Sequence, residues 1–294
     1  MQQNVLIIFN PLSGTKLSKK YIADVVDMYC KAGYICTVHA TQRRNDAAEV
    51  VCATGQNYER VVCIGGDGTL NEVLSGLFKG QHKCKIGYIP AGSTNDFANG
   101  LGLPKNILKS AKATLEGTEQ NIDIGMFNDR YFSYVASFGA FTKASYSTPQ
   151  NIKNALGHTA YLLEGIKEIA NIKPVHMKLM LANETLEDDY IFGAISNSTS
   201  LGGILTLKSD VVDMNDGLLE ILLIKAPKNI IELNECIAAL STQNYNSRML
   251  EFRSASDVVI SCSSEIEWSL DGEYEKGSSK IVIKNIPDAF TLIR

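Results

Sequence analysis

Hydrophobic residues in the first part of the chain alternate between short continuous runs and stretches with helical spacing. The continuous runs, bounded by glycine, proline or polar residues, predict strands at residues 4–10, 34–41, 60–66 and 85–92. The stretches with helical spacing predict helices at residues 18–33, 45–55, 70–80 and 106–117. Strands that alternate with helices build βαβ units, so we expect an α/β domain with a mostly parallel sheet.

The pattern changes near residue 125, where strand-like runs begin to follow one another with few helices between them. These runs lie at residues 130–141, 175–183, 188–198, 218–226, 249–255, 257–263, 265–273 and 280–286. Two further helices are expected at residues 151–170 and 228–242. Such a succession is typical of a mostly antiparallel β sandwich or partly closed barrel. We therefore expect an α/β domain over residues 1–125 and a β-rich domain over 126–294, whose last residues could return to the first domain.

Composition narrows the class of protein. The chain has 294 residues, 45% of them hydrophobic and 20% charged, which suits a globular protein of two medium domains. Its formal net charge of −4 does not indicate a nucleic-acid-binding surface, so no nucleic acid partner is expected. No apolar stretch approaches the roughly 18 residues of a membrane span, and the N-terminus does not resemble a signal peptide. The seven cysteines form no C-x-x-C pair, which argues against a zinc site or a redox dithiol. Their number is odd and most have apolar neighbours in the sequence, which fits free thiols in a reducing cytoplasm.

The stretch "VVCIGGDGTLNEV", residues 61–73, is the first candidate for chemistry. Gly65 and Gly66 follow a buried strand, and a helix is expected to begin near Leu70. Glycine permits a close approach of a ligand to the backbone, and the amides at a helix N-terminus attract phosphate. Asp67 would repel phosphate unless Mg²⁺ lay between them. The alternative is a tight strand-to-helix turn that carries an exposed aspartate.

Two other strands of the same predicted sheet end in similar residues. The first runs into "FNPLSGTK" and the fourth into "PAGSTNDFANGLGLP". Neither the G-x-x-x-x-G-K-[ST] pattern nor the G-x-G-x-x-G fingerprint occurs in the chain. Clusters of small and polar residues at several strand ends predict a nucleotide site at the carboxyl edge of an open α/β sheet.

Two later stretches carry acidic residues in turns. "DMNDGL" places the carboxylates of Asp213 and Asp216 beside a glycine turn, and such oxygen ligands suit a hard cation. The alternative is an aspartate-rich hairpin turn without a metal. In "WSLDGEYE" the strand breaks at Asp271 and Gly272, so Glu273 is expected to project from the turn. The alternative for Glu273 is a solvated glutamate with no function.

Together, "GGDGTLNEV", "PAGSTNDFA", "IDIG", "DMNDGLLEI" and "SLDGEYE" resemble the motifs of bacterial diacylglycerol kinase-like lipid kinases, in the same order. That family is related to sphingosine kinases and more distantly to NAD kinases. The resemblance runs from residue 5 to about residue 290. It implies the two-domain architecture of NAD kinases and diacylglycerol kinases, with ATP and Mg²⁺ as cofactors.

The resemblance also implies roles for individual residues. The nucleotide site would comprise Asn10, Pro11, Ser13, Gly14, Thr41, Gly65, Gly66, Asp67, Gly68, Thr69, Asn71, Glu72, Ser93, Thr94 and Asn95. The acids around a catalytic Mg²⁺ would be Asp67, Asp96 and Asp123. A second, structural Mg²⁺ would be held by Asp213, Asp216 and the backbone carbonyl of Leu218. Glu273 would be the general base.

The resemblance implies an ATP-dependent lipid kinase, with diacylglycerol converted to phosphatidate as the first candidate reaction. The alternatives are phosphorylation of phosphatidylglycerol, a monoacylglycerol or a sphingoid base, an NAD kinase, and a non-catalytic nucleotide or lipid sensor. The chain departs from the family in two segments. The strand after "IDIG" often carries an asparagine in the family, whereas here it reads "FSYVASFG" with Tyr134, and residues 205–212 lack the proline-containing run of the family. Both departures lie in the β-rich domain and bear on the choice of lipid.

A lipid substrate requires access to a membrane surface, here the inner face of the membrane. The expected helix at residues 151–170 carries an apolar stripe, and the neighbouring lysines include Lys143, Lys153 and Lys167. An apolar stripe bordered by lysines can rest on an anionic bilayer. The alternative is a helix packed on the β-rich domain. For the assembly, a homodimer is left open.

Overall fold

The chain forms two compact units. The computed structural model describes residues 3–14, 17–140, 173–201, 205–208, 210–263 and 265–294. The first unit comprises Met1–Ile122 together with Asp288–Arg294, and the second comprises Asp123–Pro287. The division therefore falls slightly before the expected residue 125, and the end of the chain belongs to the first unit.

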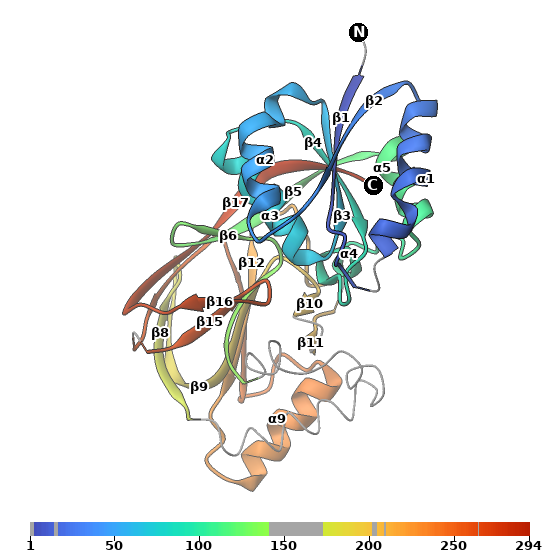
Figure 1. The fold of residues 1–294 in the computed structure, drawn as a ribbon. Coiled ribbons are helices and arrows are strands. Elements are labelled where there is room, and N and C mark those ends of the chain that lie inside the picture. Colours follow the sequence, from blue (N-terminus) through green and yellow to red (C-terminus); the bar gives the residue numbers. More distant parts are fainter. Residues whose placement is uncertain (1–2, 15–16, 141–172, 202–204, 209, 264) are drawn as a thin grey trace. The chain divides into compact units, whose positions relative to one another are not determined.

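The first unit is built on a parallel sheet with the strand order β2-β1-β3-β4 (Figure 1). The strands are β1 (Gln3–Phe9), β2 (Tyr34–Ala40), β3 (Arg60–Gly65) and β4 (Lys85–Pro90). The last residues of β17 (Lys280–Ile293) extend this sheet, because Leu292 pairs in parallel with Ile86 of β4. The expected α/β domain with a parallel sheet is confirmed.

Helices cover both faces of this sheet. In Figure 1, α1 (Leu17–Lys31) and α5 (Ile107–Glu116) lie on one side, and α2 (Asp46–Thr54) and α3 (Asp67–Lys79) on the other. Val5 and Ile7 of β1 pack in one core with Tyr29 of α1 and Ala111 of α5. β1, β3 and β4 are largely buried and read as continuous apolar runs, which is why the sequence located them, whereas β2 lies at the edge of the sheet and is partly exposed. The helical turn η1 (Gly55–Asn57) and the short α4 (Asp96–Gly100) were not expected.

The second unit is a mostly antiparallel β structure, as expected. Its strands pair in the order β16-β15-β7-β9-β8-β14-β17, with β12 on β9 and β13 on β12. They are β6 (Arg130–Phe132), β7 (Val135–Gly139), β8 (Val175–Met180), β9 (Thr185–Ser196), β12 (Leu219–Lys225), β13 (Leu250–Ala255), β14 (Asp257–Ser261), β15 (Glu267–Leu270), β16 (Glu273–Lys276) and the first part of β17. The structure also contains β5 (Glu119–Phe127), which pairs with β6 and β17, the short pair β10 (Ser200–Leu201) and β11 (Leu205–Thr206), and α9 (Ile230–Thr242).

Aromatic side chains form the centre of the second core. Trp268 of β15 is 1% exposed, and its ring centroid lies 5.1 Å from that of Phe127 and 4.9 Å from that of Phe138. Aromatic side chains bury the largest apolar areas in a core. This packing fixes β15, the strand that leads into the turn at residues 271–272.

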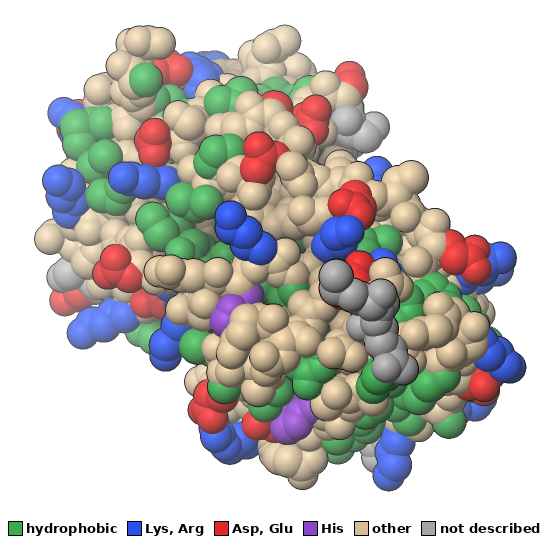
Figure 2. Space-filling view, turned by 90° about the horizontal axis from the view of Figure 1, so that it is seen from above, with side chains coloured by type: hydrophobic (Ala, Val, Ile, Leu, Met, Phe, Trp, Pro, Cys, Tyr) green, Lys and Arg blue, Asp and Glu red, His purple; other side chains and the backbone are tan. Residues whose placement is uncertain are grey.

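The expected membrane-facing helix at residues 151–170 and its lysines lie outside the described residues. Among the helices that the structure describes, none has both the length and the apolar character to cross a bilayer. On the face drawn in Figure 2, lysine and arginine side chains are interspersed with acidic ones, and apolar side chains lie between them.

Candidate functional site

The strand ends of the parallel sheet are tied together by backbone hydrogen bonds. The Asn10 amide donates to the carbonyl of Ile64 at 3.0 Å. The Thr41 amide donates to the carbonyl of Phe9 at 3.0 Å, and the Ala91 amide to the carbonyl of Gly65 at 2.8 Å. The loops that follow β1, β2, β3 and β4 therefore begin side by side, as expected for the carboxyl edge of a parallel sheet.

Three of these loops approach one another backbone to backbone, which only glycine permits. A Cβ atom on Gly92 would lie 2.4 Å from Cα of Gly66. Gly14 has φ +51°, and a Cβ atom there would lie 2.5 Å from the carbonyl oxygen of Ala91. Gly14, Gly66 and Gly92 are thus needed for the packing of the loops themselves.

Gly68 differs from these glycines. It lies in the first turn of α3, and a Cβ atom on it would meet no atom of the described part of the chain within 4 Å. Open space beside the amides of a helix N-terminus is where a phosphate group is favoured by hydrogen bonding and by the helix dipole. The packing of the described residues therefore does not require a glycine at position 68, and a bound nucleotide is a reason for one.

Polar side chains hold the first loop in shape. The Asn10 Oδ1 atom accepts from the Leu12 amide at 2.9 Å, and its Nδ2 atom lies 3.4 Å from Thr69 Oγ1. The Ser13 hydroxyl donates to the carbonyl of Asn10 at 2.9 Å. Pro11 lies in this loop, half-buried. These contacts join the predicted residues of the first loop to Thr69, and Asn71 lies two residues further along α3.

Asn95 holds the loop after β4. Its backbone is left-handed with φ +54°, its Oδ1 atom accepts from the Gly92 amide at 2.8 Å, and its Nδ2 atom donates to the Gly92 carbonyl at 3.0 Å. The structure therefore uses the side chain of Asn95 to close the loop. Ser93, which is exposed, and Thr94, which is half-buried, form the tip of the loop.

Asp67 and Asp96 are brought together. Asp67 Oδ2 accepts from the Asp96 amide at 3.0 Å, and Oδ1 accepts from the Phe97 amide at 3.1 Å. Both aspartates are buried, with exposures of 7% and 2%. Burial raises the pKa of Tyr88 well above its ordinary value, and the negative charges of Asp67 and Asp96 near its ring add to that rise. The expected helix start near Leu70 is corrected, because α3 begins at Asp67.

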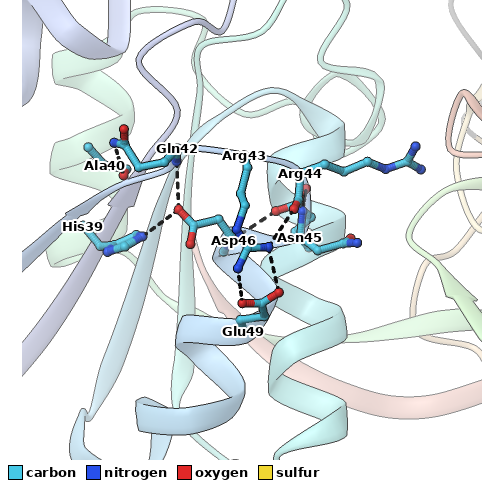
Figure 3. A network of polar contacts seen from close by, with 10 residues as sticks. His39, Ala40, Gln42, Arg43, Arg44, Asn45, Asp46 and Glu49 are labelled. Carbon is cyan, nitrogen blue, oxygen red and sulfur yellow. Dashed lines mark hydrogen bonds and ion pairs between the residues drawn. The ribbon is translucent and has the colours of Figure 1, made fainter.

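Glu72 stabilises the loop that follows Thr41. Its carboxylate accepts from the amides of Asn45 at 2.8 Å and Ala47 at 3.2 Å, at the N-terminus of α2. A carboxylate is favoured there by the helix dipole. Figure 3 shows the rest of this network: Asp46 Oδ2 accepts from the Gln42 amide at 2.8 Å and lies 3.0 Å from His39 Nε2. Glu72 therefore positions the backbone beside the predicted nucleotide residue Thr41.

Asp123 is bonded to the acidic loop of the second unit. It is 1% exposed, and its Oδ2 atom accepts from the Gly217 amide at 2.8 Å and from Asn285 Nδ2 at 2.9 Å. Its carbonyl accepts from Asn197 Nδ2 at 2.8 Å, and its amide donates to the Met214 carbonyl at 3.0 Å. The sequence grouped Asp123 with Asp67 and Asp96, whereas these contacts all lie within Asp123–Pro287.

The acidic loop has the donors that a hard cation prefers. Asp213 Oδ1 accepts from the Asn215 amide at 3.1 Å, and Asp216 Oδ1 accepts from the Leu218 amide at 2.9 Å. Glu220, at the start of β12 after the loop, is 1% exposed, and its Oε2 atom has no hydrogen-bond partner among the residues that the structure describes. Burial raises the pKa of Glu220 to about 8, and the charges of Asp216 and Asp213 add to that rise.

The chemistry of this donor set fits Mg²⁺, because its donor atoms are oxygens and the negative charges of Asp213 and Asp216 lie close enough to Glu220 to raise its pKa. Within the described residues, no group of three or more histidine, cysteine or acidic side chains is placed to hold a metal. A cation at this loop would therefore need the Leu218 carbonyl and water besides Asp213 and Asp216. Mg²⁺ commonly keeps several of its water ligands.

The turn before Glu273 is anchored by a buried carboxylate. Asp271 has φ +51° and is 6% exposed, and its two oxygens accept from the amides of Ser133, Tyr134 and Val135 and from the Ser133 hydroxyl. Burial raises the pKa of Asp271, and these hydrogen bonds oppose that rise.

The expectation that Glu273 projects from this turn is wrong. Glu273 is the first residue of β16 and pairs with Leu270. Its Oε2 atom lies 2.6 Å from Arg130 Nη2. The turn proper consists of Asp271 and Gly272, which both have positive φ, and β16 begins directly after it at Glu273.

Comparison with known proteins identifies the family. Residues 4–127 match the diacylglycerol kinase catalytic domain, and residues 135–294 match the YegS C-terminal NAD kinase beta sandwich-like domain. A diacylglycerol kinase of Bacillus subtilis (strain 168) is 32% identical over 270 residues, which cover 91% of this chain and 89% of that protein. The chain belongs to the bacterial diacylglycerol kinase family. A diacylglycerol kinase of Staphylococcus saprophyticus is 30% identical over 93% of this chain and 90% of that protein.

Solved structures agree on the fold of this diacylglycerol kinase family member. A crystal structure of a diacylglycerol kinase from Bacillus anthracis str. Sterne superposes with a TM-score of 0.76 at 20% identity, covering 99% of this chain and 96% of that chain. Another structure from the same organism gives a TM-score of 0.82 at 23% identity, covering 99% and 97%. The structures confirm the fold, and the family matches confirm the resemblance that the motifs indicated. Membership implies a kinase that uses a nucleotide.

Several residues of this family member that support its site were not found from the sequence. Asn197 and Asn285 hold Asp123, and Arg130 contacts Glu273. No local pattern pointed to them, because each lies more than 70 positions from its partner. Asp271 stood inside the quoted stretch "WSLDGEYE", but its burial could not be read from a turn-like sequence.

Proposed function

We propose that this protein is an ATP-dependent lipid kinase that converts diacylglycerol to phosphatidate. The observation that carries the proposal is the meeting of the three glycine loops at the carboxyl edge of the parallel sheet, with open space at Gly68. That arrangement suits the phosphates of a nucleotide. The 32% identity to a diacylglycerol kinase supports this choice of lipid.

The residues of the first unit would bind and orient the nucleotide. Amides in the first turn of α3 would donate to its phosphate oxygens, and Thr41 would contact the nucleotide from the end of β2. Asp67 and Asp96 would hold the Mg²⁺ that accompanies ATP, through their carboxylates or through bound water. When bound, Mg²⁺ supplies neutralisation of the phosphate charge.

The second unit would contribute a structural cation site and a base. Asp213, Asp216 and the Leu218 carbonyl would hold a second Mg²⁺, and Asp123 would keep the loop in place through the Gly217 amide. In the transfer, the lipid oxygen bonds to the γ-phosphorus, the bond from that phosphorus to ADP breaks, and the proton of the lipid hydroxyl passes to Glu273. A lipid alcohol is a poor nucleophile near neutral pH, so a positioned base accelerates the transfer.

The substrate implies contact with a membrane surface, since diacylglycerol resides in bilayers. We propose peripheral association with the cytoplasmic leaflet, in which lysines are drawn to anionic lipids. Binding to vesicles that contain anionic lipid should then weaken as salt is added. Binding that does not depend on salt would contradict the electrostatic part of this proposal.

The experiment that tests the function is a transfer assay with labelled ATP and Mg²⁺. Diacylglycerol, monoacylglycerol, phosphatidylglycerol and a sphingoid base are presented separately in mixed micelles, and NAD serves as the soluble acceptor. Label in the organic phase with diacylglycerol alone supports the proposed reaction. Label with another lipid changes the substrate, label on NAD changes the class of enzyme, and nucleotide binding without transfer indicates a sensor.

A further inference from the structure

Arg130 joins two glutamates of the strand that carries the proposed base. Its Nη2 atom lies 2.6 Å from Glu273 Oε2, and its Nη1 atom lies 2.7 Å from Glu275 Oε2. The Nη1 atom also donates to the Tyr274 carbonyl at 3.3 Å. The guanidinium group therefore spans three successive residues of β16 from its place on β6.

This arrangement contributes little to stability. The side chains of Arg130 and Glu273 are 34% and 35% exposed, so water and salt screen their attraction. Exposed ion pairs typically stabilise a fold by about 0–1 kcal/mol. What the planar guanidinium supplies instead is direction, because its donors point along fixed lines and fix the carboxylates that they contact.

The same short segment also holds the turn before Glu273. Ser133, Tyr134 and Val135 donate their amides to the buried Asp271. Arg130 and these three residues thus lie within one stretch of six residues, 130–135. The segment fixes the backbone on the N-terminal side of Glu273 through Asp271 and fixes the Glu273 side chain through Arg130.

We propose that Arg130 is a positioning residue for the phosphoryl transfer: it holds the Glu273 carboxylate in the orientation that accepts the proton of the lipid hydroxyl. The inference rests on the proposed function of Glu273. Glu275 contacts the same guanidinium group and therefore restricts its movement if the Glu273 side chain moves. A base displaced by about 1 Å can lose on the order of 100-fold in rate.

The test compares Arg130→Met with the parent protein and with a matched control. Arg253 offers that control, because it also joins two glutamates, with Nε 2.7 Å from Glu184 Oε1 and Nη2 3.2 Å from Glu251 Oε2. Its side chain is 36% exposed, close to the value for Arg130. Arg130→Met should lower kcat about 10–100-fold and leave KM for ATP unchanged. Both variants should lose a similar, small amount of thermal stability, but Arg253→Met should keep the parent kcat.

Arg130→Lys keeps the positive charge but not the two-pronged geometry, so its kcat should fall between those of the parent and Arg130→Met. Should Arg130→Met fail to fold, the lysine variant decides the question by itself. A reduced kcat at unchanged KM for ATP supports the inference, and a parent-like kcat overturns it.

A double-mutant cycle separates this inference from the proposed base. If Arg130 acts through Glu273, then Arg130→Met should cost little further rate once Glu273→Gln is present. Independent, multiplied losses would overturn the positioning role while leaving Glu273 as the base. A Glu273→Gln variant with the parent kcat would instead remove the base, and the inference about Arg130 would fall with it.

Discussion

The carboxylate of Asp67, at the start of α3, accepts a hydrogen bond of 3.0 Å from the amide of Asp96, at the start of α4. The two acids proposed to hold the nucleotide's Mg²⁺ are thus coupled through the backbone before any metal binds. Asp67 has a structural task as well as a proposed chemical one, and mutations at this position must be chosen to separate the two.

Asp67→Asn should reduce kcat by at least about 100-fold, because an amide removes the charge that would attract Mg²⁺. It keeps one acceptor oxygen, so one of the Asp96 and Phe97 amides would face an N–H group. Asp67→Ala should in addition leave the buried amides of Asp96 and Phe97 without an acceptor. An unsatisfied buried group costs about 1–3 kcal/mol. Turnover and thermal melts of both variants measure these effects, and a near-parent kcat in Asp67→Asn would rule out the metal role.

Gly68→Val should weaken ATP binding by at least tenfold and leave the fold intact, because a β-branched side chain would fill the open space over the first turn of α3. Isothermal titration with ATP and a thermal melt of the free protein report the two properties. Gly92→Ala is the contrasting variant, since its Cβ atom would meet the backbone of Gly66 at 2.4 Å and the protein itself should be destabilised. Parent-like ATP affinity in Gly68→Val would place the phosphates elsewhere.

Local patterns revealed most of the first unit because three of its strands, β1, β3 and β4, are largely buried. The run at residues 85–92 was found in this way, and β4 spans Lys85–Pro90. β5 was missed because Asn121 and Asp123 interrupt its apolar residues, and α4 is too short to show a helical period. β17 extends beyond the expected run at residues 280–286, because proline inside a run normally demotes a strand. The sequence left open a return of the last residues to the first unit, where Leu292 pairs with Ile86.

The candidate site likewise contains residues that the sequence brought together and contacts that it did not reveal. The loops that carry Gly66 and Asn95 follow predicted strands directly, so topology alone placed them together. The contacts of Asp123 with Asn197 and Asn285 join residues 74 and 162 positions apart, and the packing of the second unit decides them. No period or motif in the sequence encodes such pairings.

Mg²⁺ should raise the melting temperature in the absence of ATP, and Asp213→Ala should abolish that rise. A ligand that binds only the folded state stabilises it by about 2.7 kcal/mol at 100 times its dissociation constant. Melts with Mg²⁺ and with EDTA measure the difference, and Asp257→Ala, an exposed aspartate of the same unit, is the control. An undiminished Mg²⁺ effect in Asp213→Ala would refute the cation site.

Glu273→Gln should bind ATP like the parent and lose about 10²–10⁴-fold in kcat, because an amide cannot take the proton of the lipid hydroxyl. ATP titration and kcat measurements test both statements. A loss of ATP affinity would instead assign Glu273 to the nucleotide site, and Asp96 would be the next candidate base.

Asp271→Asn should destabilise the second unit by about 3 kcal/mol, because an asparagine presents one acceptor oxygen where the aspartate presents two. At least one of the Ser133 and Tyr134 amides would then face an N–H group in a buried place. Denaturant titration gives the free energy of unfolding. Unchanged stability would show that the turn before Glu273 does not depend on this carboxylate.

The last strand has a consequence for the synthesis of the protein and for the expression of its first unit alone. Residues 288–294 lie in the first unit, where Leu292 pairs with Ile86 of β4 and Arg294 exchanges hydrogen bonds with Thr118. A ribosome must therefore finish the whole β-rich unit before the nucleotide-binding sheet can gain its final strand. Pairings between distant segments close slowly and leave edges exposed in the meantime. Expression of residues 1–122 alone would yield a sheet with an unprotected edge at β4, prone to aggregation.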